Sequence, residues 1–395
     1  MTVPAIVYRQ RNWLLRSFAR IGVAGSIASA PATSAVTIAG AALLVAVLAA
    51  TQGWLDRHFL PSFFLPRLWY VRLETTVRLI LGGAAVALIV ARRRVTRGLA
   101  RAPIRVVSMV AAAALALGAS EMVLRSVRPR PTEWLISDEE PRRRVDPRLG
   151  WVIDPGRSGH VVVGGRSIEY AIDANGYRVR RGDAPVDLAA PTMLFTGESV
   201  MFGEGLAWDE TIPAQVESAL GVQTANLAVH GYSIDQAYLR LETELPRFRR
   251  PVAVVTVFMS ALFGRNLDDD RPHLGPGLTW MPAQPSPRLL SLAALLVPYR
   301  TDATVERGIG MTTSALQATV DLARRAGARP LILVPQIGPE SPPESALRRR
   351  ILDAAALPYV FVEIDPSWHV PWDRHPDARA DRRIGRAVAE RLREP

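Results

Sequence analysis

The feature that most constrains this chain is a long stretch without charge. Residues 21–55 contain no charged side chain, and their centre reads AVTIAGAALLVAVLAAT. About 20 apolar residues in a helix span the hydrocarbon core of a bilayer, so we expect a transmembrane helix at about 33–55. Two further runs, LILGGAAVALIVA and VVSMVAAAALALGAS, predict spans at about 73–91 and 105–124. A cleaved signal peptide followed by buried soluble helices is the alternative, although the first run is longer than a typical signal core.

Arginine placement predicts how these spans are oriented. The first 20 residues carry four arginines and no acid, and residues 92–105 carry six arginines and no acid. Arginine-rich loops stay on the cytoplasmic side of a membrane. Three spans would then place everything after about residue 125 on the periplasmic or extracellular face. The sequence therefore predicts a multi-pass protein of the cell membrane whose larger part works outside the cytoplasm.

The net charge of +11 is not spread along the chain. Residues 1–130 hold 17 arginines against 3 acids, whereas the remainder holds 31 arginines against 34 acids. The larger part therefore lacks the basic surface expected of a nucleic-acid binder. We expect the membrane, and no nucleic acid, as a partner.

The sequence contains no cysteine and no lysine. Their absence excludes disulfides, thiolate nucleophiles, iron–sulfur clusters, the P-loop lysine and Schiff-base chemistry. The histidines lack the spacing of a zinc site, so no metal and no cofactor is expected. A nucleophile is therefore expected to be serine, threonine, a carboxylate or water.

Beyond the membrane region, 1–125, the pattern changes twice. Residues 126–190 form a Pro- and charge-rich linker followed by a β-hairpin, in which HVVV and SIEYAI flank two glycines. From residue 191 apolar strands alternate with amphipathic helices to the end of the chain, as in a parallel α/β sandwich. Asp209 and Ser233 are expected to cap two of these helices.

Residues that could take part in catalysis follow several of the predicted strands. Ligands bind beyond the carboxyl ends of the strands in such sheets, and there the sequence places Ser199, Gly231, Asn266, Asp373 and His375. A histidine is suited to take a proton from a serine near neutral pH. An aspartate two residues before it can fix its tautomer. Backbone and amide N–H groups are the donors that an oxyanion hole requires.

These blocks resemble the SGNH (GDSL-like) hydrolase superfamily over roughly residues 190–395. The matching stretches are GESVMFGEG, NLAVHGYSIDQ and DRHP. The resemblance implies a three-layer α/β/α sandwich and ester hydrolysis or acyl transfer. It also implies that Ser199 is the nucleophile, Gly231 an oxyanion donor together with the N–H of Ser199, His375 the base and Asp373 its orienter.

Two positions depart from the family pattern. Glu198 stands beside the serine where an aspartate is usual. The asparagine of the third block comes several residues late, in GRNL, so either Asn266 or Ser260 is expected to be the third oxyanion donor.

Three functions are compatible with this pattern. The first is a membrane-anchored serine esterase acting outside the cytoplasm on an acylated carbohydrate, lipid or small ester. The second is an O-acyltransferase that modifies cell-envelope or exported polysaccharide through the same acyl-enzyme. The third is an inactive binding or scaffold module of the same fold, because fold alone does not decide function.

Overall fold

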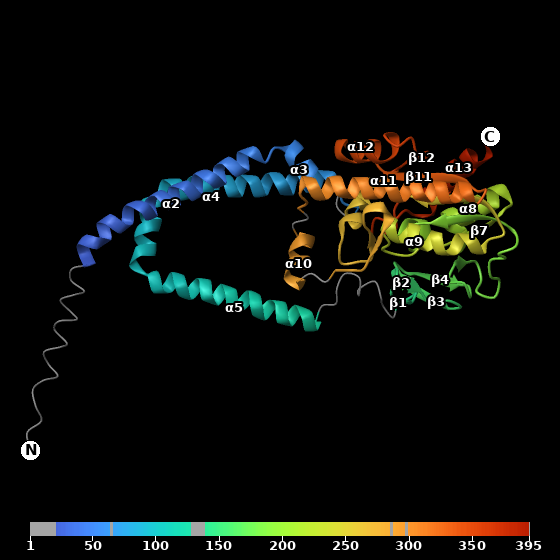
Figure 1. Ribbon diagram of the computed structural model, residues 1–395, viewed down its shortest axis with the longest axis horizontal. Coiled ribbons are helices and arrows are strands. Elements are labelled where there is room, and N and C mark those ends of the chain that lie inside the picture. Colours follow the sequence, from blue (N-terminus) through green and yellow to red (C-terminus); the bar gives the residue numbers. More distant parts are fainter. Residues whose placement is uncertain (1–20, 64–65, 128–138, 285–286, 297–298, 395) are drawn as a thin grey trace, which may run out of the picture. The chain divides into compact units, whose positions relative to one another are not determined.

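The computed structural model describes residues 21–63, 66–127, 139–284, 287–296 and 299–394. Residue contacts divide the chain into two compact units (Figure 1). The first consists of Met1–Leu55 and Leu68–Met122, and the second of Asp56–Arg67 and Val123–Pro395.

The first unit is built from long apolar helices. They are α2 (Ile21–Ala49), the start of α3 (Gln52–His58), α4 (Arg67–Arg101) and α5 (Pro103–Val127). Among the described residues, Arg67–Arg101 and Val107–Ser126 are each long and apolar enough to cross a bilayer. Two of the three predicted spans therefore coincide with helices of spanning length. The first predicted span is broken: Thr33–Ala49 and Gln52–His58 pass the same test only as a pair bent by 85°.

The break in this first span lies at Thr51. The backbone N–H of Trp54 donates to Thr51 Oγ1 at 3.3 Å, and that of Leu55 donates to the Thr51 carbonyl at 2.9 Å. A threonine in this position caps the start of a new helix. Hydropathy alone does not reveal such a cap, because threonine interrupts an apolar run only slightly.

An eight-stranded sheet forms the centre of the second unit, in the order β12-β11-β8-β6-β7-β5-β4-β3. The first five strands in this order run parallel, whereas β5, β4 and β3 pair antiparallel. The strands are β3 (Ser158–Val163), β4 (Arg166–Ile172), β5 (Arg178–Val179), β6 (Pro191–Thr196), β7 (Gln223–Asn226), β8 (Arg250–Val257), β11 (Arg329–Ile337) and β12 (Tyr359–Ile364). Every strand expected after residue 190 is present, so the α/β pattern is confirmed.

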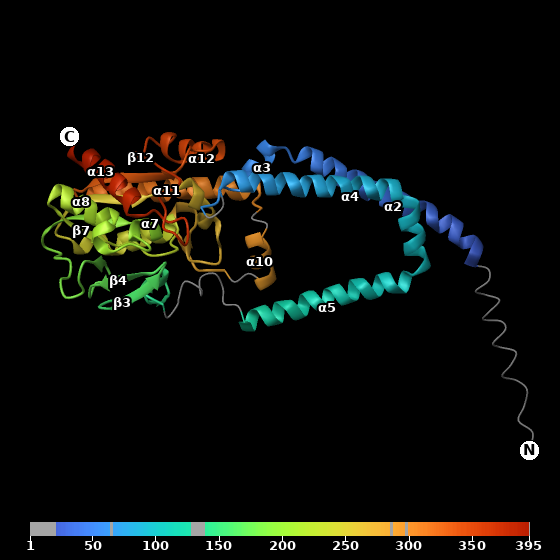
Figure 2. The same ribbon diagram turned by 180° about the vertical axis from the view of Figure 1, so that it is seen from behind.

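Helices cover both faces of this sheet. On one face α8 (Ile212–Leu220) packs against α13 (Ala378–Arg393), and on the other α9 (Ile234–Glu244) packs against α11 (Asp302–Arg325), as Figures 1 and 2 show from opposite sides. The remaining elements are α7 (Ser199–Phe202), α10 (Arg288–Leu296), α12 (Pro342–Arg348) and the small pairs β1 (Arg143–Asp146) with β2 (Gly150–Ile153) and β9 (His273–Leu274) with β10 (Trp280–Met281).

The predicted hairpin forms β3 and β4. Gly164 and Gly165 connect them with φ angles of 57° and 77°, the positive values that a tight two-residue turn requires. Both strands belong to the large sheet. The sheet therefore runs across the domain boundary predicted at residue 190.

One of the two predicted caps is confirmed. The Ser233 side chain accepts from the Gln236 N–H and the Gln236 side chain accepts from the Ser233 N–H, a capping box at the start of α9. The prediction for Asp209 is wrong, because α8 begins at Ile212 with Thr211 as its cap. Pro213 sets this start, since proline is tolerated in a helix only within the first turn.

A buried arginine connects the antiparallel strand β5 to the turn that follows β6. Arg178, on β5, is 1% exposed. Its guanidinium donates to the carbonyls of Phe202 and Gly203 at 2.7 Å and of Leu206 at 2.5 Å. Burial lowers the pKa of Arg178 to about 10, so the group remains charged at neutral pH. These three carbonyls have one charged donor instead of water.

We expect Arg178→Met to destabilise the second unit by about 3 kcal/mol, because it removes the charged donor of three buried carbonyls. Thermal or denaturant unfolding of the full-length protein measures the loss. Arg180→Met is the matched control: Arg180 is exposed and pairs with Asp209 at the surface, where a pair contributes at most about 1 kcal/mol. Equal losses in the two variants would contradict a role for the buried guanidinium.

Candidate active site

The serine singled out by sequence lies in a tight turn after β6. Ser199 is the first residue of α7, and Glu198 caps this helix by accepting the N–H of Val200 at 3.1 Å. Gly197 leaves no room for a side chain, because a Cβ there would lie 2.3 Å from Val257 Cγ1. The short helix ends at Gly203, which has a φ of 84°. Glycine before and after the serine thus makes the turn possible.

The predicted aspartate and histidine lie in the loop before α13. The N–H of His375 donates to Asp373 Oδ1 at 2.7 Å, and the His375 carbonyl accepts from the N–H of Val370 at 2.8 Å. Asp377 then caps α13 by accepting the N–H groups of Arg379 and Ala380. The loop is therefore fixed by its own hydrogen bonds on both sides of the histidine.

The structure brings the three predicted residues together. His375 Nε2 lies 2.8 Å from Ser199 Oγ, and His375 Nδ1 lies 2.8 Å from Asp373 Oδ2. Ser199 is 4% and His375 7% exposed. This is the order of contacts in which a carboxylate orients an imidazole and the imidazole exchanges a proton with a hydroxyl.

Glu198 offers the serine a second proton acceptor. The Ser199 hydroxyl also donates to Glu198 Oε2 at 2.7 Å, yet it has only one hydrogen to give. When that hydrogen points to Glu198, His375 Nε2 must itself be protonated in order to bond the serine. When His375 is neutral, the hydrogen can turn to Nε2. The protonation state of His375 therefore determines whether the serine hydroxyl donates to Glu198 or to His375.

The charge around His375 favours its protonated form. Burial opposes the charge, but the hydrogen bond to Asp373 and the negative charges of Glu204, Asp373 and Glu198 outweigh it, and the pKa of His375 is raised from its ordinary 6.5. Burial likewise opposes ionisation of Asp373, and the hydrogen bond from His375 overcomes it, so the pKa of Asp373 is lowered.

Glu204 is a site neighbour that the sequence analysis did not single out. Its Oε2 lies 2.8 Å from Nε2 of the buried His230. Burial opposes its ionisation, but the contact with His230 and the charges of His375 and Arg143 outweigh it and lower the pKa of Glu204, while burial lowers the pKa of His230 itself. The carboxylate of Glu204 in turn favours the charged form of His375. Its position five residues after Ser199, within GEG, gives no sign of this role in the sequence.

The residues predicted to form the oxyanion hole each make hydrogen bonds to other parts of the chain. Gly231 is buried with a φ of 76°, and its carbonyl accepts from Arg271 at 2.5 Å. Asn266 accepts the N–H of Ile234 at 3.0 Å and donates to Thr312 Oγ1 at 2.9 Å. Ser260 donates to the Glu344 carbonyl at 3.1 Å.

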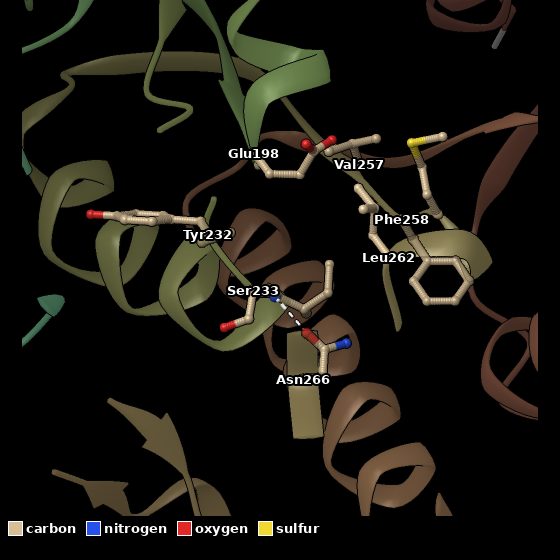
Figure 3. A pocket seen from close by; sticks show the side chains of 11 residues that line it. Glu198, Tyr232, Ser233, Val257, Phe258, Leu262 and Asn266 are labelled. Atoms are coloured by element: carbon tan, nitrogen blue, oxygen red, sulfur yellow. Dashed lines mark hydrogen bonds between the residues drawn. The ribbon is translucent and has the colours of Figure 1, made fainter. Parts of the chain in front are cut away.

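Asn266 nevertheless lies close to the residues that precede Ser199. It lines a small pocket with Gly197 and Glu198, and Figure 3 shows Glu198 and Asn266 on opposite sides of it. Ser260 does not line this pocket. Of the two alternatives, Asn266 is the one that lines this pocket beside Glu198.

Arg265, directly before Asn266, is another residue that the sequence analysis passed over. Its Nη1 lies 3.5 Å from Glu198 Oε2. The side chain is 19% exposed, so a positive charge reaches the site from the loop after β8. Both residues belong to the same 3₁₀ turn, Ser260–Leu267, which explains how a late block still reaches the site.

No protein-family model matches this chain, and no curated protein sequence matches it. Among the solved structures that it resembles are a carbohydrate esterase, a GDSL-like lipase and a lipolytic protein. A carbohydrate esterase family 2 enzyme of Corynascus thermopiles has 16% identity and a TM-score of 0.34, covering 53% of this chain and 68% of its own. A GDSL-like lipase of Bacteroides thetaiotaomicron has 14% identity and a TM-score of 0.30, covering 51% and 87%. A G-D-S-L family lipolytic protein of Veillonella parvula has 10% identity and a TM-score of 0.29, covering 51% and 97%.

Proposed function

We propose that this protein is a serine ester hydrolase that works through an acyl-enzyme on Ser199. The observation that carries the proposal is the contact of 2.8 Å between Ser199 Oγ and His375 Nε2, with Asp373 on the other ring nitrogen. An isolated serine hydroxyl is a weak nucleophile, and an adjacent oriented base is what activates it.

The reaction follows from these contacts. Neutral His375 takes the hydroxyl proton as Ser199 Oγ attacks the ester carbonyl carbon, and Asp373 stabilises the imidazolium that forms. His375 then gives the proton to the departing alcohol, which leaves an acyl-serine. Water attacks this acyl group, its proton passes to His375 and then to Ser199, and the acid is released. The products are one acid and one alcohol for each ester and water consumed.

The backbone N–H groups of Ser199 and Gly231 are the proposed donors to the oxyanion. The N–H of Ser199 lies at the start of α7, where the partial positive charge of a helix end favours an anion. An asparagine amide carries two N–H groups. Since Thr312 accepts one from Asn266, the other makes Asn266 the proposed third donor.

The same proposal places the protein in the cell membrane, with its catalytic unit on the periplasmic or extracellular side. The two helices of spanning length and the arginine-rich segment 92–105 support this location. Acylated carbohydrate, lipid or small esters are the proposed substrates. An acyltransferase would differ only in its acceptor, a sugar hydroxyl instead of water.

We expect the full-length protein to be labelled by a tagged fluorophosphonate and to hydrolyse p-nitrophenyl acetate. Ser199→Ala and His375→Ala should each abolish labelling and lower kcat by about 10³- to 10⁶-fold, because the serine and its base act as a unit. Asp373→Asn should lower kcat by about 10⁴-fold, because it disturbs the tautomer of His375.

Ser367→Ala is the matched control, since this serine is exposed and its hydroxyl donates to Asp365 in a turn. A folded wild-type protein that is neither labelled nor active would favour the inactive scaffold function. Release of acid that is replaced by transfer when a polysaccharide is added would favour the acyltransferase.

A second prediction concerns pH. Hydrolysis requires neutral His375, so kcat/KM should rise with pH through a pKa above 6.5. Glu198→Gln removes one of the negative charges that raise this pKa, so the acidic limb should move to lower pH. Glu242→Gln, at a surface ion pair with Arg148, should leave the limb in place. An unmoved limb in Glu198→Gln, or one moved to higher pH, would be at odds with the charge arrangement described for the site.

A further inference from the structure

The segment between the first two apolar helices belongs to the second unit and packs into it. The His58 carbonyl accepts the N–H of Arg300 at 2.8 Å. The His58 ring stacks on Tyr299 at 5.4 Å, and the Phe59 ring meets the same tyrosine edge-on at 5.8 Å. A backbone bond and two ring contacts thus anchor a segment that lies about 240 residues before its partners in sequence.

The far end of this segment reaches the candidate active site. Phe63 is 4% exposed and belongs to the same apolar cluster as Val257 and Met201, which flank the turn of the nucleophile. Its ring centroid lies 5.2 Å from that of His375, and the two ring planes are inclined by 59°. This is the separation and inclination of a favourable aromatic pair.

The contact with Phe63 completes the surroundings of His375. Hydrogen bonds to Ser199 and Asp373 fix its two nitrogens, but they allow the ring to tilt about the line that joins them. An aromatic ring packed at an angle restricts that tilt and keeps water away. The titratable groups that interact with the imidazole include Asp373, Glu204, Glu198 and His230, and Phe63 adds an apolar contact to it.

We propose that Phe63 is a positioning residue for His375, so that the segment before α4 forms part of the catalytic site. This inference rests on the proposed function of His375 as the base. The structure supports it through the anchoring of residues 58–60 and the ring contact of Phe63. The catalytic site then combines residues that precede α4 in the sequence with residues that follow α5.

Kinetics of the full-length protein test the proposal. Phe63→Ala should lower kcat for p-nitrophenyl acetate by about 10- to 100-fold, because a misplaced catalytic group costs up to that factor, and should leave KM within about twofold. Water entering beside His375 changes both the burial that opposes its charge and the screening of the carboxylates that favour it, so the acidic limb of kcat/KM should move. Phe63→Leu, which keeps an apolar contact, should recover most of the activity.

Phe361→Ala is the matched control, since Phe361 lies exposed on β12 and should leave kcat and the limb unchanged. Full activity in Phe63→Ala would overturn the proposal. So would a loss of activity with an unmoved pH limb and no recovery in Phe63→Leu, because that result indicates general damage to the fold. Wild type and Ser199→Ala in the same series show separately whether the proposed hydrolysis itself fails.

A second measurement does not depend on activity. The chain has no cysteine, so single cysteines report their own accessibility to a membrane-impermeant maleimide in intact cells. Ser62→Cys, at an exposed position, should be labelled rapidly, whereas Phe63→Cys, at the buried neighbour, should be labelled only after denaturation. Equal labelling of the two cysteines would overturn the packing of this segment against the second unit. So would a failure to label either cysteine, both in intact cells and after the membrane is opened.

Discussion

The geometry of the candidate site depends on how the backbone after Ser199 is held. The carbonyls of Phe202, Gly203 and Leu206 accept from the buried guanidinium of Arg178. The side-chain amide of Asn226 donates to the carbonyls of Met201 and Phe202 at 3.2 and 3.3 Å. A short helix cannot satisfy its own last carbonyls, so these donors from β5 and β7 are what allow one turn of helix to present a serine. Strand β5, from the antiparallel part of the sheet, therefore helps to support the candidate site.

Glu198 changes the chemistry that this turn can perform. It caps the helix that begins at Ser199 and accepts the serine hydroxyl at the same time. When His375 is protonated, its Nε2–H donates to the serine oxygen while the serine hydroxyl donates to Glu198. As pH rises, His375 loses its proton and competes for the serine hydrogen. Arg265, 3.5 Å from the carboxylate of Glu198, offers it another partner when the serine turns away.

Much of this arrangement is visible in the sequence, for physical reasons. Continuous apolar strands, the glycine pair of the hairpin and the Ser233 capping box are local patterns, and each forms as expected. Ser199, Asp373 and His375 could be named because strand ends converge on one edge of a sheet. The contacts of Arg178, Glu204 and Arg265 depend on tertiary packing. Arginine is the only basic residue type in this chain besides histidine, so no composition signal separates the buried guanidinium from those at the surface.

The contacts of the segment containing Phe63 also depend on tertiary packing, between residues far apart in the sequence. They also bear on the proposed membrane topology. By hydropathy these residues are only a loop between two apolar runs. In the proposed membrane topology, their packing against Tyr299 and His375 places them on the same side as the proposed catalytic unit. Between them and residue 123 the chain passes through α4 and α5, and in that topology two crossings return it to the side from which it started. This holds whether the bent pair before Phe63 crosses the membrane or not, so the proposed sidedness of the site does not depend on the first apolar run.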